Sequence, residues 1–401
     1  KFVALARTFP AGYQEIFVND LETNRKRQLT FDEKNIGSVF WSRSDDVIFS
    51  SNKGGNSNLW IITAAGGTAV QVTKGSGPDM RMKLSTDGKK LVYLQQQRFG
   101  HASIADSTGN GARQLPLGDR DLRAASMSPA GRHIALQIFD PDPLKSISHI
   151  YTSDQDGSNM RQLTSGIEMV AGPVWSPDGR WIAYSTRAPT SPIESTQVYV
   201  IDPANPAAPR LVGAGSEVWW LNSSDLVMFD GLRSWQVSIE GNRMERIYDD
   251  STQAFPIIGG RYILFRDFRK GWEGWWIVGS SAEKEKDSML VAFESRYLAG
   301  PPPPQAYADS MMNIRNTAIR VPKFVLHDLR TVALGPDGRY LLYAQNAGEV
   351  WKMTLPDGHK RRLEGQLVGN EVNLSVSSDG REILYVDSRV SSKLVMVANI
   401  Y

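Results

Sequence analysis

One phrase recurs along the whole chain and constrains the fold more than any other feature. Its clearest copy, WSPDGRWIAYST, starts at Trp175. Degraded copies start at Trp41, Leu84, Met127, Leu334 and Val376, and weaker ones at Trp220 and Pro256. A unit that repeats every roughly 40 residues is typical of small sheets that are stacked or arranged radially, so we expect the chain to consist of such sheets.

The copy from Pro173 to Val212 shows what one repeat does. The stretch from Ser176 to Gly179 predicts a tight turn, because proline presets φ and glycine takes positive φ at low steric cost. The surrounding residues predict four short strands, at 173–175, 181–185, 198–202 and 210–212. Such a sheet is apolar on both faces, so neighbouring sheets must stack face to face. Closing the array into a ring removes its exposed ends, and that ring is a β-propeller.

The predicted fold class is therefore all-β, a single β-propeller of four-stranded antiparallel blades over residues 1–401. The first strands number eight, so we expect eight blades, with counts from seven to nine left open by the two ends of the chain. Residues 1–30 add a second, third and fourth strand but no first strand. The ring could close if Gln28-Leu29-Thr30 completed the final sheet. Residues 282–323, with a PPPP run, are interpreted as an insertion between blades or as a further degenerate blade.

The charge and cysteine content narrow the classes of partner. The chain has 45 basic and 43 acidic residues, so nothing in it demands nucleic acid or an anionic membrane. No apolar run is long enough for a spanning helix, and no signal pattern opens the chain. Residue 1 is Lys, which favours a segment cut from a longer precursor. Zero Cys excludes disulfides, thiolate zinc sites and Cys nucleophiles, and is compatible with an oxidising compartment.

The motifs together resemble a known repeat family. The pattern S-P-D-G-x-x-I-A-Y-x-S, an aromatic–aliphatic strand that ends in Asp, a D-G or G-G turn, and R-Q-L-T are similar to the TolB-type, WD40-like β-propeller repeat. The stretch from Leu29 to Gly67 also resembles propeller domains of bacterial regulators. The resemblance implies a propeller in a periplasmic or other extracytoplasmic location. TolB itself carries an additional α/β domain and about six blades, so this chain is expected to be a relative in architecture and not in role.

No catalytic or cofactor motif is present. The sequence lacks G-x-S-x-G, H-E-x-x-H, the P-loop pattern and G-x-G-x-x-G after a strand. The run DQDGS from Asp154 fails the EF-hand pattern, because Asn159 and Ser165 stand at the positions that require Gly and Glu. A hairpin turn explains it better. Asp140 and Asp142 form an acidic pair that suits a solvated loop. We therefore expect no cofactor and no metal.

Long, varied loops indicate where binding occurs. Loops between second and third strands, at 95–101, 139–149, 186–196 and 267–274, lie on the face opposite the S-P-D-G turns, and variable loops on a rigid scaffold usually carry function. The binding candidates on this face, at the mouth of the central channel, are Arg98, His101, Arg123, Asp140, His149, Glu168, Glu194, Glu217, Arg269, Trp272, His327 and Arg330. For each charged residue, the alternative is solvation of its loop or pairing with a neighbouring blade. Trp272 is either a platform for a peptide or sugar, or the anchor of its own loop.

Three functions fit these observations. The leading hypothesis is a non-catalytic propeller that binds a protein or peptide as the sensory or extracytoplasmic part of a larger bacterial protein. A carbohydrate is the alternative ligand. The rival is a polysaccharide lyase or other glycan-processing enzyme, in which His101, His149, Arg98 and Arg123 supply acid, base and cation. The third is a structural subunit of a large assembly.

Overall fold

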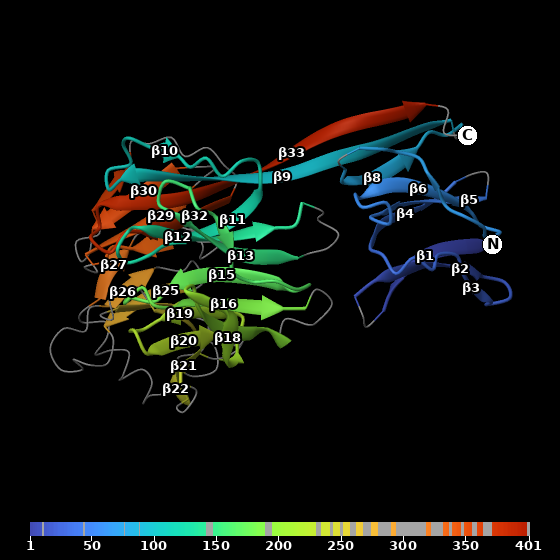
Figure 1. The fold of residues 1–401 in the computed structure, drawn as a ribbon. Coiled ribbons are helices and arrows are strands. Elements are labelled where there is room, and N and C mark those ends of the chain that lie inside the picture. The colour runs from blue at the N-terminus through green and yellow to red at the C-terminus, as the bar shows by residue number, and fades with distance from the viewer. Residues whose placement is uncertain are drawn as a thin grey trace. The chain divides into compact units, whose positions relative to one another are not determined.

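The computed structural model consists of strands and turns (Figure 1). It describes residues 1–229 apart from 10–11, 43–44, 76, 88, 142–146 and 189–194, and then 234–240, 332–336, 339–345, 349–354, 359–363 and 371–398. Between 244 and 321 it describes only the backbone of several strands. Over these ranges no helix is long and apolar enough to cross a membrane. The all-β prediction is confirmed.

The chain divides into two compact units, which are described separately. The first comprises Lys1–Phe99, Phe139–Ile147 and Arg389–Tyr401, and the second Gly100–Ile138 and Ser148–Ser388. The single 1–401 propeller therefore stays a prediction. The described part of the predicted insertion at 282–323 is two strands that pair with the preceding sheet, and the rest of 282–323 lies outside the described residues.

The first unit contains one three-stranded and one four-stranded sheet. The three-stranded sheet has the order β1 (Phe2–Thr8), β2 (Gln14–Asp20) and β3 (Lys26–Gln28). The four-stranded sheet is β4 (Ile36–Trp41), β5 (Asp46–Ser51), β6 (Asn58–Thr63) and β7 (Val70–Gln71). Beyond them, β8 (Asp79–Leu84) pairs with the first half of β9 (Lys90–Asp106). Residues 1–30 thus form the three strands that the sequence predicts.

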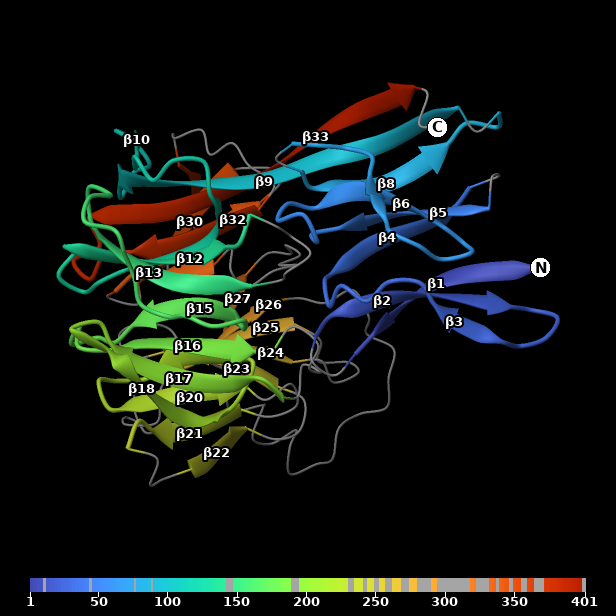
Figure 2. The same cartoon turned by 45° about the vertical axis from the view of Figure 1, so that its right-hand side comes forward.

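The second unit contains sheets that follow the predicted four-strand grammar (Figure 2). Three of them are β11 (Asp121–Met127) to β14 (Arg161–Gln162), with β12 (His133–Phe139) and β13 (Ser148–Asp154); β15 (Met169–Trp175) to β18 (Asn205–Ala214), with β16 (Ile182–Arg187) and β17 (Gln197–Asp202); and β19 (Glu217–Trp220) to β22 (Met244–Tyr248), with β20 (Asp225–Phe229) and β21 (Ser234–Ser238). A fourth is β28 (Val332–Leu334) to β31 (Lys360–Arg362), with β29 (Tyr340–Gln345) and β30 (Glu349–Thr354). The sheet of β23 (Thr252–Pro256), β24 (Tyr262–Asp267), β25 (Gly274–Gly279), β26 (Leu290–Phe293) and β27 (Ala318–Val321) departs from the predicted four antiparallel strands. It has five strands, because β27 adds to β26 in parallel.

One sheet joins distant parts of the chain and corrects two expectations. Its order is β10 (Arg113–Gln114), β9, β33 (Glu382–Ala398) and β32 (Glu371–Val376). Residues 100–114 therefore complete the final repeat, and Gln28 instead pairs with Phe17 inside the N-terminal sheet. The predicted loop at 95–101 is also absent, because these residues continue β9 as an extended strand.

The sheets of the second unit stack through their apolar faces, as the pattern predicts. Leu384 on β33 and Leu136 on β12 belong to one buried cluster, and Val200 on β17 and Leu226 on β20 to another. The Trp220 indole also donates from β19 to a backbone carbonyl of β15. These sheets therefore bury faces that each could not cover alone.

The S-x-D-G turn is stabilised by its own side chains. In the copy at Ser176, the Ser176 hydroxyl donates to Asp178 Oδ1 (2.6 Å) and accepts from the Trp181 amide (2.9 Å). Asp178 Oδ1 also accepts from the Arg180 amide, and Gly179 has a φ of 72°. The same hydrogen bonds recur at Ser85–Lys90 and Ser377–Glu382. The motif thus specifies a hairpin turn.

The R-Q-L-T phrase connects the fourth strand to its surroundings. Thr164 Oγ1 accepts from the Ile150 amide of the third strand (2.9 Å), and Gln162 Nε2 donates to the Thr164 carbonyl (2.7 Å). The Arg161 guanidinium reaches the Pro203 carbonyl in the turn of the following sheet. Equivalent contacts join Thr30 to Ile16, Thr73 to Leu59, and Arg27 to Ala64 and Ala65. The phrase therefore holds the fourth strand to the third strand of its own sheet and to a turn of the following sheet.

Candidate functional site

The structure places seven of the predicted binding residues. Arg98 and His101 lie on β9, Arg123 on β11, His149 on β13, and Glu217 opens β19, while Asp140 follows β12 and Glu168 precedes β15. Glu194, Arg269, Trp272, His327 and Arg330 lie outside the described residues. Arg98 belongs to the first unit, whereas His101, Arg123 and His149 belong to the second. A joint catalytic role of these four residues stays a prediction.

Arg123 forms an ion pair on its own strand. Its Nε lies 3.0 Å from Asp121 Oδ1 and its terminal nitrogen 2.8 Å from Asp121 Oδ2. The Asp121 side chain is 9% exposed. This two-point contact holds the guanidinium at the start of β11 and balances its charge, which supports the structural alternative weighed for it.

His101 contacts the neighbouring strand of its sheet. Gln114 Nε2 lies 2.9 Å from His101 Nδ1. Since an amide nitrogen donates, Nδ1 is the acceptor in this contact. In the R-Q-L-T copy at residue 162 the glutamine instead donates to the carbonyl two residues on; here Pro116 stands in place of that threonine. His101 therefore takes the place of the backbone carbonyl that this glutamine contacts in the copy at residue 162.

A cluster of polar residues surrounds the start of β15. The β15-start cluster consists of Gln137, Ser148, Glu168, Thr186 and Arg187, which come from the ends of β12 and β16 and the beginnings of β13 and β15. These elements meet because the second strands β12 and β16 end at the same edge of the sheets at which β13 and β15 begin. His149 is next to Ser148 on β13. The cluster thus gathers side chains from two adjacent sheets.

Hydrogen bonds to the backbone of β15 position the cluster. The Val170 carbonyl accepts from Ser148 Oγ (2.6 Å) and from Gln137 Nε2 (2.8 Å). Ser148 Oγ also lies 2.9 Å from the Val170 amide. On the other side, Thr186 Oγ1 donates to Glu168 Oε2 at 3.3 Å. These contacts hold the side chains of two sheets around one strand end.

Two polar atoms of the cluster are buried without a partner. Gln137 is 2% exposed, and its Oε1 accepts no hydrogen bond from any described residue. Arg187 Nε is likewise buried and donates to no described residue. They flank the same strand start, since Gln137 contacts Val170 and Arg187 is in register with Met169. An unmet buried donor or acceptor costs about 1–3 kcal/mol, so a ligand that met both would gain affinity.

Burial and the charge of Glu168 both act on Tyr184, which lies on β16 two residues before Thr186. Burial raises the pKa of Tyr184 far above its ordinary value, and the nearby Tyr199 and Glu168 raise it further. The Tyr184 and Tyr199 rings stack 5.9 Å apart. Glu168 is exposed, so its carboxylate is available to a ligand. Among the residues with described side chains, no three of His, Asp and Glu gather as a metal site.

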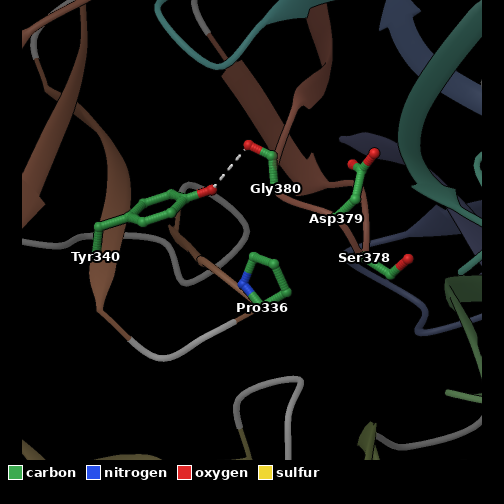
Figure 3. A pocket seen from close by; sticks show the side chains of 5 residues that line it. All are labelled: Pro336, Tyr340, Ser378, Asp379 and Gly380. Carbon is green, nitrogen blue, oxygen red and sulfur yellow. Dashed lines mark hydrogen bonds between the residues drawn. The ribbon is translucent and has the colours of Figure 1, made fainter.

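A concavity at the opposite, turn-bearing end of the second unit has a structural explanation. Pro336, Tyr340, Ser378, Asp379 and Gly380 line it (Figure 3). The Tyr340 hydroxyl points to the Gly380 carbonyl at 3.4 Å, and Lys352 Nζ lies 3.6 Å from the centroid of the Tyr340 ring. These contacts join two neighbouring turns of the repeat, so we place the functional site at the β15-start cluster instead.

Comparison with known proteins agrees with this fold. A family model described as the TolB beta propeller domain matches residues 3–191. These residues, a little under half of the chain, match the TolB β-propeller family. The resemblance seen in the sequence is thereby confirmed, and the TolB-type repeat accounts for the S-x-D-G turns and the R-Q-L-T contacts. A search of curated protein sequences finds no match.

The solved structures that are similar to this chain are distant. TolB from Acinetobacter baumannii shares 17% identity at a TM-score of 0.28, over 62% of this chain and 64% of that one. A putative TolB from Agrobacterium tumefaciens shares 14% identity at a TM-score of 0.34, over 94% of this chain and 98% of that one. An oligogalacturonate lyase in complex with manganese shares 13% identity at a TM-score of 0.38, over 96% of each chain. The chain thus spans less than two thirds of the Acinetobacter TolB.

Sequence reasoning missed Gln137 and Arg187. Both lie near the ends of apolar second strands, where they read as ordinary strand residues. The one available signal was a polar residue inside IALQIF and at the end of IAYSTR, where the repeat otherwise places apolar or small residues. Glu168 and His149, which sequence reasoning did single out, lie in and beside the cluster.

Proposed function

We propose that this chain is a non-catalytic TolB-type propeller that binds an extended peptide segment of a protein partner at the β15-start cluster. The observation that carries the proposal is the pair of buried, unmet atoms on either side of β15. Gln137 Oε1 is an acceptor and Arg187 Nε is a donor. An extended peptide presents N–H and C=O groups alternately, so one segment satisfies both.

Neighbouring side chains suit the same ligand. Ile167 is 67% exposed beside Glu168 and offers an apolar contact. The Glu168 carboxylate favours a peptide with a Lys or Arg, because an opposite charge improves association. Contacts of this kind on loops around a rigid scaffold are typical of binding sites.

The proposal includes the ring predicted from the repeats. Eight blades around one axis would place the β15-start cluster at the mouth of the central channel, on the face of the long loops. Support comes from the stacking of successive first strands, in which β11 packs on β32, β15 on β11, and β19 on β15. The absence of Cys is compatible with the proposed extracytoplasmic location.

A random peptide library displayed on phage, selected on the immobilised chain, tests the proposal. We expect selected peptides to bind Glu168→Gln and Arg187→Gln at least roughly ten-fold more weakly, since each loses a hydrogen bond with a charged group. Arg180→Gln is the matched control, because Arg180 is exposed at the opposite end of the same sheet. Peptides that bind all three variants equally would place binding elsewhere.

The two rival functions have their own readouts. Incubation with polygalacturonate, followed by ultraviolet absorption of an unsaturated product, tests the lyase. A product that His149→Ala abolishes would replace the binding proposal with an enzyme. Size-exclusion chromatography of native extract tests the structural subunit, which predicts elution only in a large assembly.

A further inference from the structure

The turn between β9 and β10 contains the pair Asn110-Gly111, which is the one Asn-Gly pair in the sequence. In such a pair the glycine nitrogen can attack the carbonyl carbon of the asparagine side chain, because glycine has no side chain to hinder the approach. The attack closes a five-membered ring and starts deamidation. In a folded chain the reaction depends on the surroundings of both groups.

The attacking nitrogen of Gly111 is accessible. Its N–H group donates no backbone hydrogen bond to a residue of the described ranges. Gly111 is exposed, has a φ of 63°, and a Cβ added to it would meet nothing within 4 Å. Water or hydroxide can therefore reach this N–H group and remove its proton, which the attack requires.

The Asn110 side chain is exposed and held by a weak contact. Its Nδ2 donates to the Thr108 hydroxyl at 3.1 Å, and water can replace such an exposed contact with little loss of free energy. The backbone is held more firmly, since the Asn110 amide donates to Asp106 Oδ1 and the Asn110 carbonyl accepts from the Asp106 amide, each at 3.0 Å. The side chain can thus turn toward the Gly111 nitrogen while the turn stays closed.

Asp-Gly pairs in other described turns show the opposite arrangement. Aspartate can close the same ring with a following glycine, so these pairs are a fair comparison. In three of them the glycine amide donates at 2.9 Å to the backbone carbonyl three residues earlier, namely Gly157 to Asp154, Gly179 to Ser176 and Gly380 to Ser377. Their turns engage the nitrogen that would attack, whereas the β9–β10 turn leaves it exposed.

We propose that Asn110 is a site of spontaneous deamidation in the folded chain. Once the Gly111 N–H group has lost its proton to water or hydroxide, the nitrogen attacks Asn110 Cγ and forms a C–N bond, and Nδ2 leaves as ammonia. The product is a succinimide. Water then cleaves the ring: opening at Cγ gives aspartate, and opening at the main-chain carbonyl carbon of residue 110 gives isoaspartate. No oxidant or reductant takes part.

Both products disturb the turn that precedes β10. The Thr108 hydroxyl donates to Asp106 Oδ1 and accepts from Asn110, so a carboxylate at position 110 loses the second contact and adds a charge near Asp106. Isoaspartate also lengthens the backbone by one methylene group. Beyond the turn, Leu115 is 2% exposed in the core and its amide donates to the Ala102 carbonyl. The modification should therefore lower the melting temperature.

Peptide mapping of the intact folded chain, aged in mildly alkaline buffer, tests the proposal. Trypsin releases residues 99–113, in which Asn110 is the single asparagine. Chromatography with mass spectrometry separates the asparagine, aspartate and isoaspartate forms of this peptide. We expect the asparagine form to be lost with time, and faster at higher pH, because more of the Gly111 N–H group is then deprotonated. Asn110→Gln should abolish the loss, since glutamine would have to close a six-membered ring, which forms far more slowly.

Two controls show whether the turn decides the outcome. The tryptic peptide of residues 146–161 contains Asp156-Gly157, and it should gain no isoaspartate in the folded chain. In urea it should gain isoaspartate, because the Gly157 amide then loses its hydrogen bond. Asn24→Gln changes an exposed asparagine in the turn between β2 and β3, and it should leave the loss at Asn110 unchanged.

The melting temperature gives a second readout. Ageing should lower it for the wild type relative to its own fresh sample, whereas Asn110→Gln should keep the value of its fresh sample. A wild type that converts at Asn110 without any such drop would contradict the predicted effect on the turn.

Two results overturn the proposal. In the first, the folded chain keeps Asn110 intact while the chain in urea loses it at the same pH, so that the turn protects the pair. In the second, the folded chain gains isoaspartate at Asp156 as fast as at Asn110, so that the exposure of the glycine N–H group does not select the site.

Discussion

Thr164→Val tests whether the R-Q-L-T phrase stabilises the fold through its threonine. Thr164 Oγ1 accepts from the amide of Ile150 at 2.9 Å, and Ile150 is fully buried. Valine has nearly the same shape but cannot accept a hydrogen bond. The Ile150 amide would then be buried without its partner, while the contact of Gln162 with the backbone carbonyl of residue 164 would remain.

The magnitude follows from the cost of that unmet amide. A buried donor without a partner costs about 1–3 kcal/mol, and the added methyl group offsets part of it. We therefore expect the free energy of unfolding to fall by about 1–2 kcal/mol, which corresponds to a drop of roughly 2–6 °C in melting temperature. Thermal unfolding followed by circular dichroism measures the shift.

Thr152→Val is the matched control for this prediction. Thr152 lies on β13 and is half-buried, and its hydroxyl makes no hydrogen bond to a described residue. The control should melt close to the wild type. If Thr164→Val melts within a degree of Thr152→Val, the threonine is not the stabilising element of the phrase, and the reasoning is refuted.

Three other variants test local features of the fold. Gly157→Ala should lower the melting temperature more than Gly111→Ala does. Both glycines have positive φ, but only at Gly157 would a Cβ lie 2.9 Å from Pro116 Cδ. Equal losses of melting temperature would contradict this. Burial raises the pKa of Tyr343 to about 12, so stability is fully present below the ordinary value of about 10 and is lost between there and pH 12. Tyr343→Phe should flatten this alkaline loss in denaturant titrations, and an unchanged slope would count against it. Hydrogen bonds from a serine hydroxyl and a backbone amide lower the pKa of Asp379, so its contribution is present above the unfolded value and lost as the pH falls through the folded one. Asp379→Asn should therefore reduce the acid sensitivity of the melting temperature, unless the turn is stabilised without the carboxylate.

The local grammar of the repeat was predictable because its causes are local. Ser176, Asp178 and Gly179 make the turn with contacts inside six residues. The strand at 198–202 follows from β-branched and aromatic residues and appears as β17. The resemblance of residues 3–191 to the TolB-type repeat follows from the same motifs.

Long-range pairing was not predictable in the same way. That β9 and β10 complete the sheet of β32 and β33 depends on contacts between distant residues, and no local pattern distinguishes residues 100–106 from another third strand. The β15-start cluster depends likewise on how two sheets meet. Gln137 is an ordinary strand residue until its amide reaches Val170.

The shared sheet of β9 and β33 has a consequence for synthesis of the chain on the ribosome. The Ser388 hydroxyl donates to the Leu122 carbonyl across 266 residues of sequence, and contacts so remote in sequence form late. While translation proceeds, β9 has a free edge until β33 has been synthesised. A nascent chain would thus stay vulnerable to pairing with strands of neighbouring chains until β33 emerges, so loss of β32 and β33 should affect solubility far more than their size suggests.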